Sequence, residues 1–247
     1  MHANYQAAED LLQDRIVLLT GAGDGIGRAM AMAYARHGAT VVLLGKTVAK
    51  LEQVYDEIEA AGGPTPAIYP MHLEGATPHD YDELAEAMQS NFGRLDGILH
   101  NAASLPYLSR IKDYDTEDWL KVMQVNLNAP FQITRVCLPL LDKSADASVI
   151  FTTDAVGHVG KAFWGAYGVS KFGIEGLTQI LAAELENGPI RVNCIDPGPT
   201  RTALRKKAFP GEQNAGLKTP DTLAPLYLWA MGPDSRGITG QRLAWDD

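Results

Sequence analysis

Short apolar runs alternate with longer amphipathic stretches along most of the chain. Runs that are rich in Val, Ile and Leu and bounded by turn residues are typical of buried strands. They predict strands at residues 16–19, 41–44, 67–73, 95–99, 149–151, 190–195 and 243–245. Apolar positions with helical spacing predict helices at residues 26–37, 50–61, 82–92, 116–141, 165–186 and 221–231. Strands that alternate with helices in this way indicate βαβ units and a parallel sheet.

Connections between parallel strands are right-handed, so the helices have to cover both faces of the sheet. We therefore predict an α/β fold, a Rossmann-type doubly wound parallel sheet of about seven strands. No linker interrupts the chain, and residues 1–247 are expected to form a single domain with a looser segment at 201–218. Ligands bind such sheets outside the carboxyl ends of the strands, so reactive residues are expected directly after the apolar runs.

The overall charge narrows the classes of partner. The chain has 21 Lys and Arg against 30 Asp and Glu, a formal net charge of −9. This argues against nucleic acid or an anionic membrane, because both bind basic surfaces. Cys137 and Cys194 cannot build a disulfide framework and are expected in the core. The histidines have no metal-ligand spacing, and neither a signal peptide nor a transmembrane run is visible, so we expect a cytoplasmic protein without a metal.

A glycine-rich turn follows the first predicted strand, where residues 20–27 read Thr-Gly-Ala-Gly-Asp-Gly-Ile-Gly. Glycines let the backbone turn tightly and approach a pyrophosphate, and the helix start that follows offers free N–H groups. The alternative is a tight strand-to-helix turn that binds nothing. The candidate phosphate-binding residues are Gly21, Gly23, Asp24, Gly25, Ile26 and Gly27.

The residue after the second predicted strand indicates which dinucleotide is bound. Sites specific for NAD place a carboxylate there to hold the ribose 2′-hydroxyl, whereas this chain has Lys46. A lysine attracts a 2′-phosphate, which favours NADP(H) over NAD(H). Arg28 is a second candidate for that phosphate. Alternatively, Lys46 is a solvated lysine at a helix start.

Tyr167 and Lys171 stand four residues apart on the helix predicted after the fifth strand. This spacing places both side chains on one face. A free tyrosine has a pKa of about 10, and a neighbouring ammonium group favours the phenolate. The sequence therefore predicts that Lys171 brings the pKa of Tyr167 close to neutral pH, where a general acid/base is most effective. In isolation the same spacing also fits an ordinary surface pair.

The glycine turn and the Tyr-x-x-x-Lys pair together resemble the short-chain dehydrogenase/reductase family over nearly the whole chain. Residues 11–16 and 164–167 further resemble a bacterial group of uncharacterised oxidoreductases within it. The resemblance implies hydride transfer between a nicotinamide cofactor and a small carbonyl or alcohol substrate, with Tyr167 as general acid/base. It also implies a homodimer or homotetramer built on two long helices. The apolar residues Val122, Val125, Phe131 and Val136 fit either the core or such an interface.

The resemblance assigns further roles by position. Asn126 takes the place of a catalytic asparagine that holds a water beside Lys171, and Lys171 also binds the nicotinamide ribose. His72 stands where the family has Asp, and Ala103 where it has Gly. Residues 201–218 correspond to a substrate lid. The basic run at 205–207 fits a solvated surface, an anionic or phosphate-bearing substrate, or the phosphates of the cofactor. The remaining cofactor contacts are expected from His72, Leu73, Asn101, Ala102, Ala103, Pro197, Gly198, Thr200 and Thr202.

The family serine that binds the substrate oxygen is replaced by Asp154, thirteen residues before Tyr167. Three interpretations remain open: a protonated Asp154 donates to the substrate, Thr153 substitutes for the serine, or carbonyl reduction is impaired. The third suggests a rival function, an NADP(H)-binding sensor or scaffold. A methyltransferase that uses S-adenosylmethionine is a second rival. The missing carboxylate after the second strand and the ordered Asn, Tyr and Lys count against it.

Overall fold

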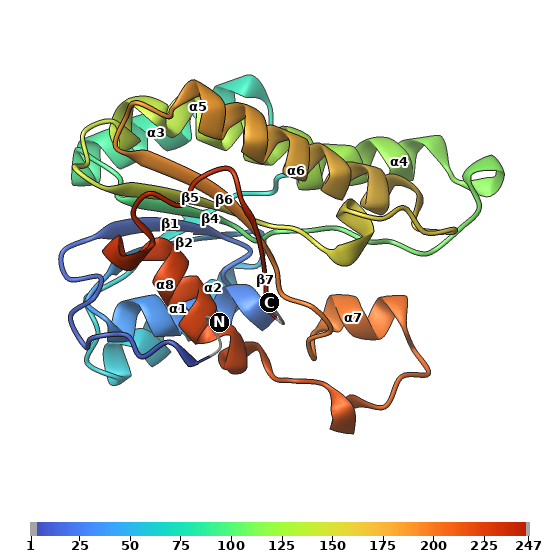
Figure 1. The fold of residues 1–247 in the computed structure, drawn as a ribbon, viewed down its shortest axis with the longest axis horizontal. Helices are drawn as coiled ribbons and strands as arrows, with labels where there is room; N and C mark the ends of the chain where they lie inside the picture. Colours follow the sequence, from blue (N-terminus) through green and yellow to red (C-terminus); the bar gives the residue numbers. More distant parts are fainter. Residues whose placement is uncertain (1–3, 246–247) are drawn as a thin grey trace.

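The computed structural model describes residues 4–245 of the chain. Within them seven parallel strands form one sheet, in the order β3-β2-β1-β4-β5-β6-β7 (Figure 1). The strands are β1 Ile16–Thr20, β2 Thr40–Gly45, β3 Ala67–Pro70, β4 Gly97–His100, β5 Ala147–Thr152, β6 Ile190–Asp196 and β7 Arg242–Ala244. The strand order reverses between β1 and β4, and ligands bind at such a switch point. The predicted doubly wound fold is confirmed.

Helices cover both faces of the sheet (Figure 1). One face carries α1 Gly25–Arg36, α2 Val48–Ala60 and α8 Ala224–Met231. The other carries α3 Pro78–Phe92, α4 Thr116–Met123, α5 Ala129–Leu141 and α6 Gly165–Glu184. A short helix, α7 Ala203–Ala208, lies beyond the carboxyl edge of the sheet and covers no face of it.

The alternation of side chains along each strand divides the core into two layers. Leu19 packs on the side of α1, α2 and α8, whereas its neighbour Leu18 packs on the side of α3, α5 and α6. A third apolar cluster, centred on the buried residues Val122 and Tyr167, lies at the carboxyl edge below α7. The phenol of Tyr167 is therefore held by apolar packing on the side where ligands bind.

The helix at 78–92 begins four residues before its predicted start, because the local sequence caps it. Thr77 and Asp80 form a reciprocal capping box, and Pro78 occupies the first turn. Gly93 then ends the helix in the left-handed conformation, with φ of 75°. The other predicted helices agree with the structure to within a few residues at their ends.

Two predicted segments are more structured than expected. The region 116–141 is not one uniform helix, because residues Gln124–Asn128 form a π-helical turn between α4 and α5. The looser segment at 201–218 contains α7, whose first turn is capped by the hydroxyl of Thr202, which accepts from the Arg205 N–H at 3.1 Å. Both features lie next to the functional site described below.

A buried ion cluster closes the amino edge of the sheet. The carboxylate of Asp146 pairs with Arg191 and, at 3.0 Å, with Arg15, and all three side chains are at most 12% exposed. Arg236 approaches the same carboxylate at 3.6 Å but is 67% exposed. The cluster ties β5, β6 and the start of β1 together at the end opposite the carboxyl edge of the sheet.

Neither membrane insertion nor metal binding finds support among residues 4–245. None of their helices combines the length and apolar character needed to cross a bilayer. Their His, Cys, Asp and Glu side chains form no group of three or more that could hold a metal ion. Cys137 and Cys194 are free thiols in the core, as predicted. A cytoplasmic location stays a prediction.

Candidate active site

A cavity of about 830 Å³ runs along the carboxyl edge of the sheet. It is lined by the segments that follow β1, β2, β3, β4, β5 and β6, together with residues of α6 and α7. Nineteen of the predicted site residues line it: Gly21, Gly23, Asp24, Gly25, Ile26, Lys46, His72, Leu73, Asn101, Ala102, Ala103, Thr153, Asp154, Tyr167, Lys171, Pro197, Gly198, Thr200 and Thr202. Gly27 and Asn126 do not line it, and each has a different role.

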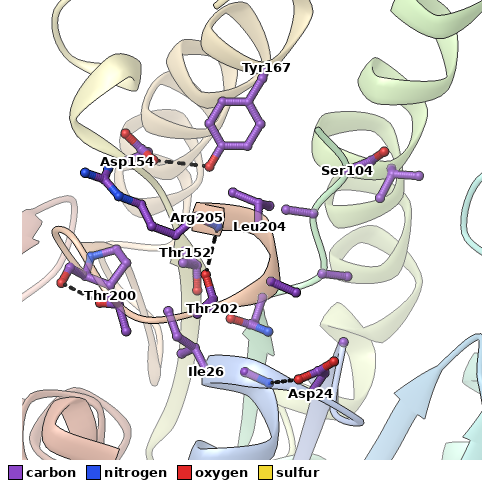
Figure 2. Close-up of a pocket in the computed structure, with 18 of the residues that line it drawn as sticks. Asp24, Ile26, Ser104, Thr152, Asp154, Tyr167, Thr200, Thr202, Leu204 and Arg205 are labelled. Carbon is purple, nitrogen blue, oxygen red and sulfur yellow. Dashed lines mark hydrogen bonds between the residues drawn. The ribbon is translucent and has the colours of Figure 1, made fainter. Parts of the chain in front are cut away.

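The glycine turn is shaped by close approach of the backbone. A Cβ at Gly27 would lie 2.1 Å from the carbonyl oxygen of Gly21, so this glycine lets α1 pack against the end of β1. Gly21 and Gly25 have positive φ of 69° and 52° and leave the floor of the cavity without side chains. Asp24 caps α1 by accepting from the Gly25 N–H at 2.7 Å (Figure 2). The cradle fits a pyrophosphate over the start of α1.

Two lysines stand where the adenosine end of a dinucleotide is expected. Lys46 is exposed on the wall of the cavity, and no ion pair of its side chain is found within the described part of the chain. Lys50, in the first turn of α2, binds the Asp24 carboxylate at 2.5 Å. Arg28 is turned away, because its guanidinium binds Glu57 at 2.5 Å and it does not line this cavity. Of the two predicted phosphate partners, Lys46 lines the cavity and Arg28 does not.

Asn101 ties the ends of neighbouring strands together. Its backbone N–H donates to the Thr20 hydroxyl at 3.0 Å, and the N–H of Ala102 donates to the same oxygen at 3.1 Å. These bonds join the end of β4 to the end of β1, between which the cavity opens. The methyl group of Ala103 lines the cavity without closing it.

The reactive centre brings Tyr167 and Asp154 together. The Tyr167 hydroxyl donates to the Asp154 carboxylate at 3.3 Å, and Figure 2 shows the two groups pointing toward one another at the cavity wall. The second carboxylate oxygen accepts from the backbone N–H of Val156 at 3.1 Å. Burial raises the pKa of Tyr167 well above its ordinary value, and the charge and hydrogen bond of Asp154 raise it further. The expectation of a Tyr167 pKa near neutrality was therefore wrong.

Lys171 is buried one helical turn from Tyr167, with its ammonium nitrogen 5.5 Å from the centre of the phenol ring. It donates to the carbonyl oxygen of Thr152 at 2.6 Å, which holds it at the end of β5. Burial lowers the pKa of Lys171 to about 8, although the nearby carboxylate of Asp154 acts in the opposite direction. The predicted pair therefore shares one face of α6 and one wall of the cavity.

Thr153 does not bring its hydroxyl to Tyr167. Its Oγ1 donates instead to the buried carboxylate of Glu175, two turns further along α6, at 3.0 Å. Glu175 also contacts Arg242 at 3.3 Å, and the guanidinium of Arg242 binds Asp196 at 2.5 Å. The neighbouring hydroxyl is thus committed to a buried ion network behind the site, which leaves Asp154 as the side chain that meets Tyr167.

Asn126 lies in the π-helical turn and is buried. Its amide oxygen accepts from the Ser104 N–H at 2.7 Å, and its amide nitrogen donates to the Ser104 carbonyl at 3.0 Å and the Ser170 hydroxyl at 3.1 Å. It therefore fastens the loop after β4 to α6 and does not face the cavity directly. The widened turn provides the room for an amide that serves two neighbours at once.

The substrate end of the cavity is closed by α7 and an aromatic wall. The ring of Trp164 lies 5.6 Å from that of Tyr167 and 5.8 Å from that of Phe209, which follows α7. Arg205 stacks on Phe209 at 3.8 Å and forms a two-point ion pair with Glu212, at 2.7 and 2.6 Å. Thr202 and Leu204 face the same space (Figure 2).

Sequence reasoning missed several residues that line or support this site. Thr47 and Lys50 belong to the first turn after β2, and they could have been included because that turn lies at the carboxyl edge. No local signal pointed to Trp164 and Phe209, since their meeting depends on how α7 folds back. Glu175 stands four residues after Lys171 and so shares its helix face, a spacing that could have identified it.

Comparisons with known proteins agree with this geometry. The family model for short chain dehydrogenases matches residues 15–213. The uncharacterised oxidoreductase YciK of Escherichia coli K12 is 50% identical over 237 residues, which cover 96% of this chain and 94% of that protein. The predicted resemblance to this bacterial group is confirmed.

Two solved structures of short chain dehydrogenases contain nicotinamide cofactors. One from Shigella flexneri, complexed with NADP, is 48% identical to this chain and has a TM-score of 0.95. The match covers 97% of this chain and 100% of the Shigella chain. One from Escherichia coli CFT073, complexed with NADPH, is 50% identical with a TM-score of 0.93, covering 96% and 98%. Family membership also excludes the methyltransferase alternative. The chain belongs to the short-chain dehydrogenase family and is an NAD(P)-dependent dehydrogenase/reductase.

Proposed function

We propose that the protein transfers a hydride between NADP(H) and a small carbonyl or alcohol substrate, with Tyr167 as general acid/base. The observation that carries this proposal is the continuity of the cavity. One groove joins the glycine cradle of α1 to the hydroxyl of Tyr167. A dinucleotide laid along it would place its phosphates on the cradle and its reactive ring beside the tyrosine.

The choice of NADP(H) rests on Lys46. An exposed lysine in place of the usual carboxylate supplies attraction for a 2′-phosphate and removes the partner that a ribose 2′-hydroxyl needs. The relatives solved with NADP and NADPH, at 48% and 50% identity, support the same choice. Bound in the groove, the cofactor would supply or accept the hydride. Pro197, Gly198, Thr200 and Thr202 would hold its carboxamide end, and Lys171 its ribose.

In the reductive direction Tyr167 would give its proton to the oxygen that becomes the alcohol. A raised pKa suits this role, because it keeps the phenol protonated at neutral pH. Lys171 would then stabilise the phenolate left behind. Asn126 acts as a positioning residue, since it holds the loop at Ser104 and the helix at Ser170 in place.

The substitution Tyr167→Phe tests the proposal. We expect kcat for NADPH-dependent reduction to fall by about a hundredfold or more, because the proton donor is lost, while the Kd for NADPH stays unchanged. Tyr55→Phe is a matched control, since Tyr55 lies on α2 and does not line the cavity. Reduction at the wild-type rate in Tyr167→Phe would contradict the assigned role.

A second candidate function is a sensor or scaffold that binds NADP(H) without turnover. The bond from the Tyr167 hydroxyl to Asp154 favours it, because this bond occupies the proton that a carbonyl substrate requires. A rise in unfolding temperature with NADPH, combined with no oxidation of NADPH across a panel of ketones, aldehydes and imines, would support this alternative.

We also propose a homo-oligomer formed through α5 and α6. Phe131, Val169, Phe172 and Ile180 on these helices are 44% to 59% exposed. Such a set of apolar side chains on two adjacent helices fits burial against a second copy. Val122, which by sequence fits either the core or the interface, is buried in the core. Sedimentation of the wild type and of Phe172→Glu would test this, with a monomer expected only for the variant.

A further inference from the structure

The carboxylate of Asp154 faces the position where the reacting group of the substrate must lie. The Tyr167 hydroxyl and an oxygen of Asp154 are 3.3 Å apart on the same cavity wall (Figure 2). A carbonyl oxygen next to both groups would meet one donor, the Tyr167 hydroxyl, and one negatively charged acceptor, the Asp154 carboxylate. Two acceptors facing each other repel, so the second half of this site does not suit a carbonyl oxygen.

The neighbouring hydroxyl of Thr153 does not relieve that mismatch. The hydroxyl of Thr153 already donates to Glu175 at 3.0 Å, so it is not available to the substrate. Both oxygens of Asp154 accept hydrogen bonds, one from the Val156 N–H and one from Tyr167. This pattern belongs to a carboxylate that acts as acceptor, and such a group is complementary to a donor on the substrate.

The charges around the phenol point the same way. The carboxylates of Asp154 and Asp196 lie near it, and that of Glu175 lies behind Thr153. Two cations, Lys171 and Arg242, stand against these three carboxylates. Arg242 forms salt bridges with both Glu175 and Asp196, but its single positive charge offsets only one of these two carboxylates, and Lys171 offsets one more. His158, which contacts Glu175, is 66% exposed. On the rim, Arg205 is paired with Glu212, and Lys161 is exposed. The reacting position therefore carries a net negative charge.

We propose that this site takes protonated C=N compounds, with Asp154 binding the N–H of the iminium group and favouring it over a ketone. The inference rests on the proposed function, because it uses the same cofactor groove and the same hydride transfer. An iminium nitrogen offers what Asp154 lacks, a donor with positive charge. Its planar skeleton would lie against Trp164, whose ring face attracts cations.

The electron balance of the step needs no further reagent. The carbon of the C=N group accepts a hydride from the reduced nicotinamide, and the π electron pair of the double bond moves to nitrogen. NADPH becomes NADP⁺, and the iminium cation becomes a neutral amine that keeps its N–H toward Asp154. The proton that the amine later takes up comes from solvent, so Tyr167 does not need to release its own in this step.

The test compares 3,4-dihydroisoquinoline with the ketone 1-tetralone in wild type, Asp154→Ser and Asp154→Asn. We expect the wild type to have at least a tenfold higher kcat/KM for the imine. Both substitutions should lower kcat/KM for the imine by roughly ten- to a hundredfold, because a charged hydrogen bond is lost. Both should also raise it for the ketone, because Ser and Asn each supply a donor.

The controls separate failure of this inference from failure of the proposed function. Asp113→Asn makes the same charge change on an exposed turn outside the cavity and should leave the ratio of imine to ketone unchanged. A rise in unfolding temperature with NADPH shows that each Asp154 variant is folded and binds cofactor. Ketone reduction without imine reduction overturns the inference and leaves the proposed function standing. NADPH binding with neither reaction overturns both.

Discussion

The hydroxyl of Tyr167 lies 3.3 Å from the carboxylate of Asp154 and donates a hydrogen bond to it. This contact opposes the effect that a neighbouring lysine has on the pKa of a tyrosine. Lys171 would favour the phenolate, but burial and the negative charge of Asp154 favour the phenol. The site is consequently arranged to keep a proton, which suits reduction better than oxidation at neutral pH.

The pH dependence of alcohol oxidation should reveal this arrangement. In the proposed mechanism oxidation needs Tyr167 as a base, and the raised pKa of Tyr167 shifts its deprotonation to alkaline pH. The substitution Asp154→Asn removes two of the causes that raise this pKa, so the rising limb of kcat/KM should move to lower pH. A profile that stays in place or moves to higher pH contradicts this account.

Lys46 should set the preference for NADP(H). Removing its charge in Lys46→Ala should weaken NADPH binding by about ten- to a hundredfold, the effect of losing one charge-assisted hydrogen bond. NADH has no 2′-phosphate, so its Kd should hardly change. Lys112→Ala serves as the matched control, since Lys112 is exposed on a distant turn outside the cavity. Isothermal titration with both cofactors measures the effect, and equal weakening for NADH and NADPH would remove Lys46 from the phosphate site.

Gly27 should tolerate no side chain. A Cβ at this position would lie 2.1 Å from the backbone oxygen of Gly21, and neither backbone segment can move freely. We expect Gly27→Ala to lower the free energy of unfolding by about 1–3 kcal/mol and to weaken NADPH binding. Gly211→Ala is the control, because nothing lies within 4 Å of the added methyl group. Urea denaturation followed by fluorescence compares the two, and equal stability would show that the turn can relax.

Asp146 should be important for stability rather than for chemistry. Asp146→Ala leaves Arg191 and Arg15 as buried cations without their partner, which costs about 3–5 kcal/mol. Arg236→Ala removes an exposed partner of the same carboxylate and should cost at most about 0.5 kcal/mol. Chemical denaturation near neutral pH provides both values, and a loss below about 1 kcal/mol for Asp146→Ala would contradict this prediction.

The same cluster gives the protein an acid-sensitive element. Burial alone would raise the pKa of Asp146, but Arg15 and Arg191 hold it below its ordinary value. A carboxyl group whose pKa is lower in the folded state contributes stability above its unfolded pKa, and this contribution disappears as the pH falls. The difference in unfolding free energy between wild type and Asp146→Ala should therefore narrow in acid.

The fold could be predicted from the sequence because each strand is a short, continuous apolar run and each helix has its own periodicity. All seven predicted strands and the glycine turn are found where the pattern placed them. The first residues of helices are harder to predict from the sequence, because capping by Thr77 or Thr202 depends on two or three side chains rather than on periodicity. Lys46 and Tyr167 could be proposed as site residues from the sequence, because Lys46 directly follows a predicted strand and Tyr167 shares a helix face with Lys171.

The pKa values and hydrogen-bond partners of the site could not be predicted from the sequence in the same way. The sequence spacing of Tyr167 and Lys171 indicates that the two share a face, but the pKa of the phenol depends on burial and on which groups surround it. The direction of the Thr153 hydroxyl depends on Glu175, and Glu175 in turn on Arg242 from the far end of the chain. Such long-range choices are made by tertiary packing, which a single sequence does not record.

The π-helical turn at Asn126 has a mechanical consequence. One amide holds the backbone on both sides of Ser104 and the hydroxyl of Ser170, three residues from Tyr167 on the same helix. The loop that borders the substrate and the helix that carries the acid/base are thereby clamped to one another. A substrate that pushes the loop outward has to pull on the tyrosine helix as well, so the shape of a bound molecule and the alignment of the proton donor change together.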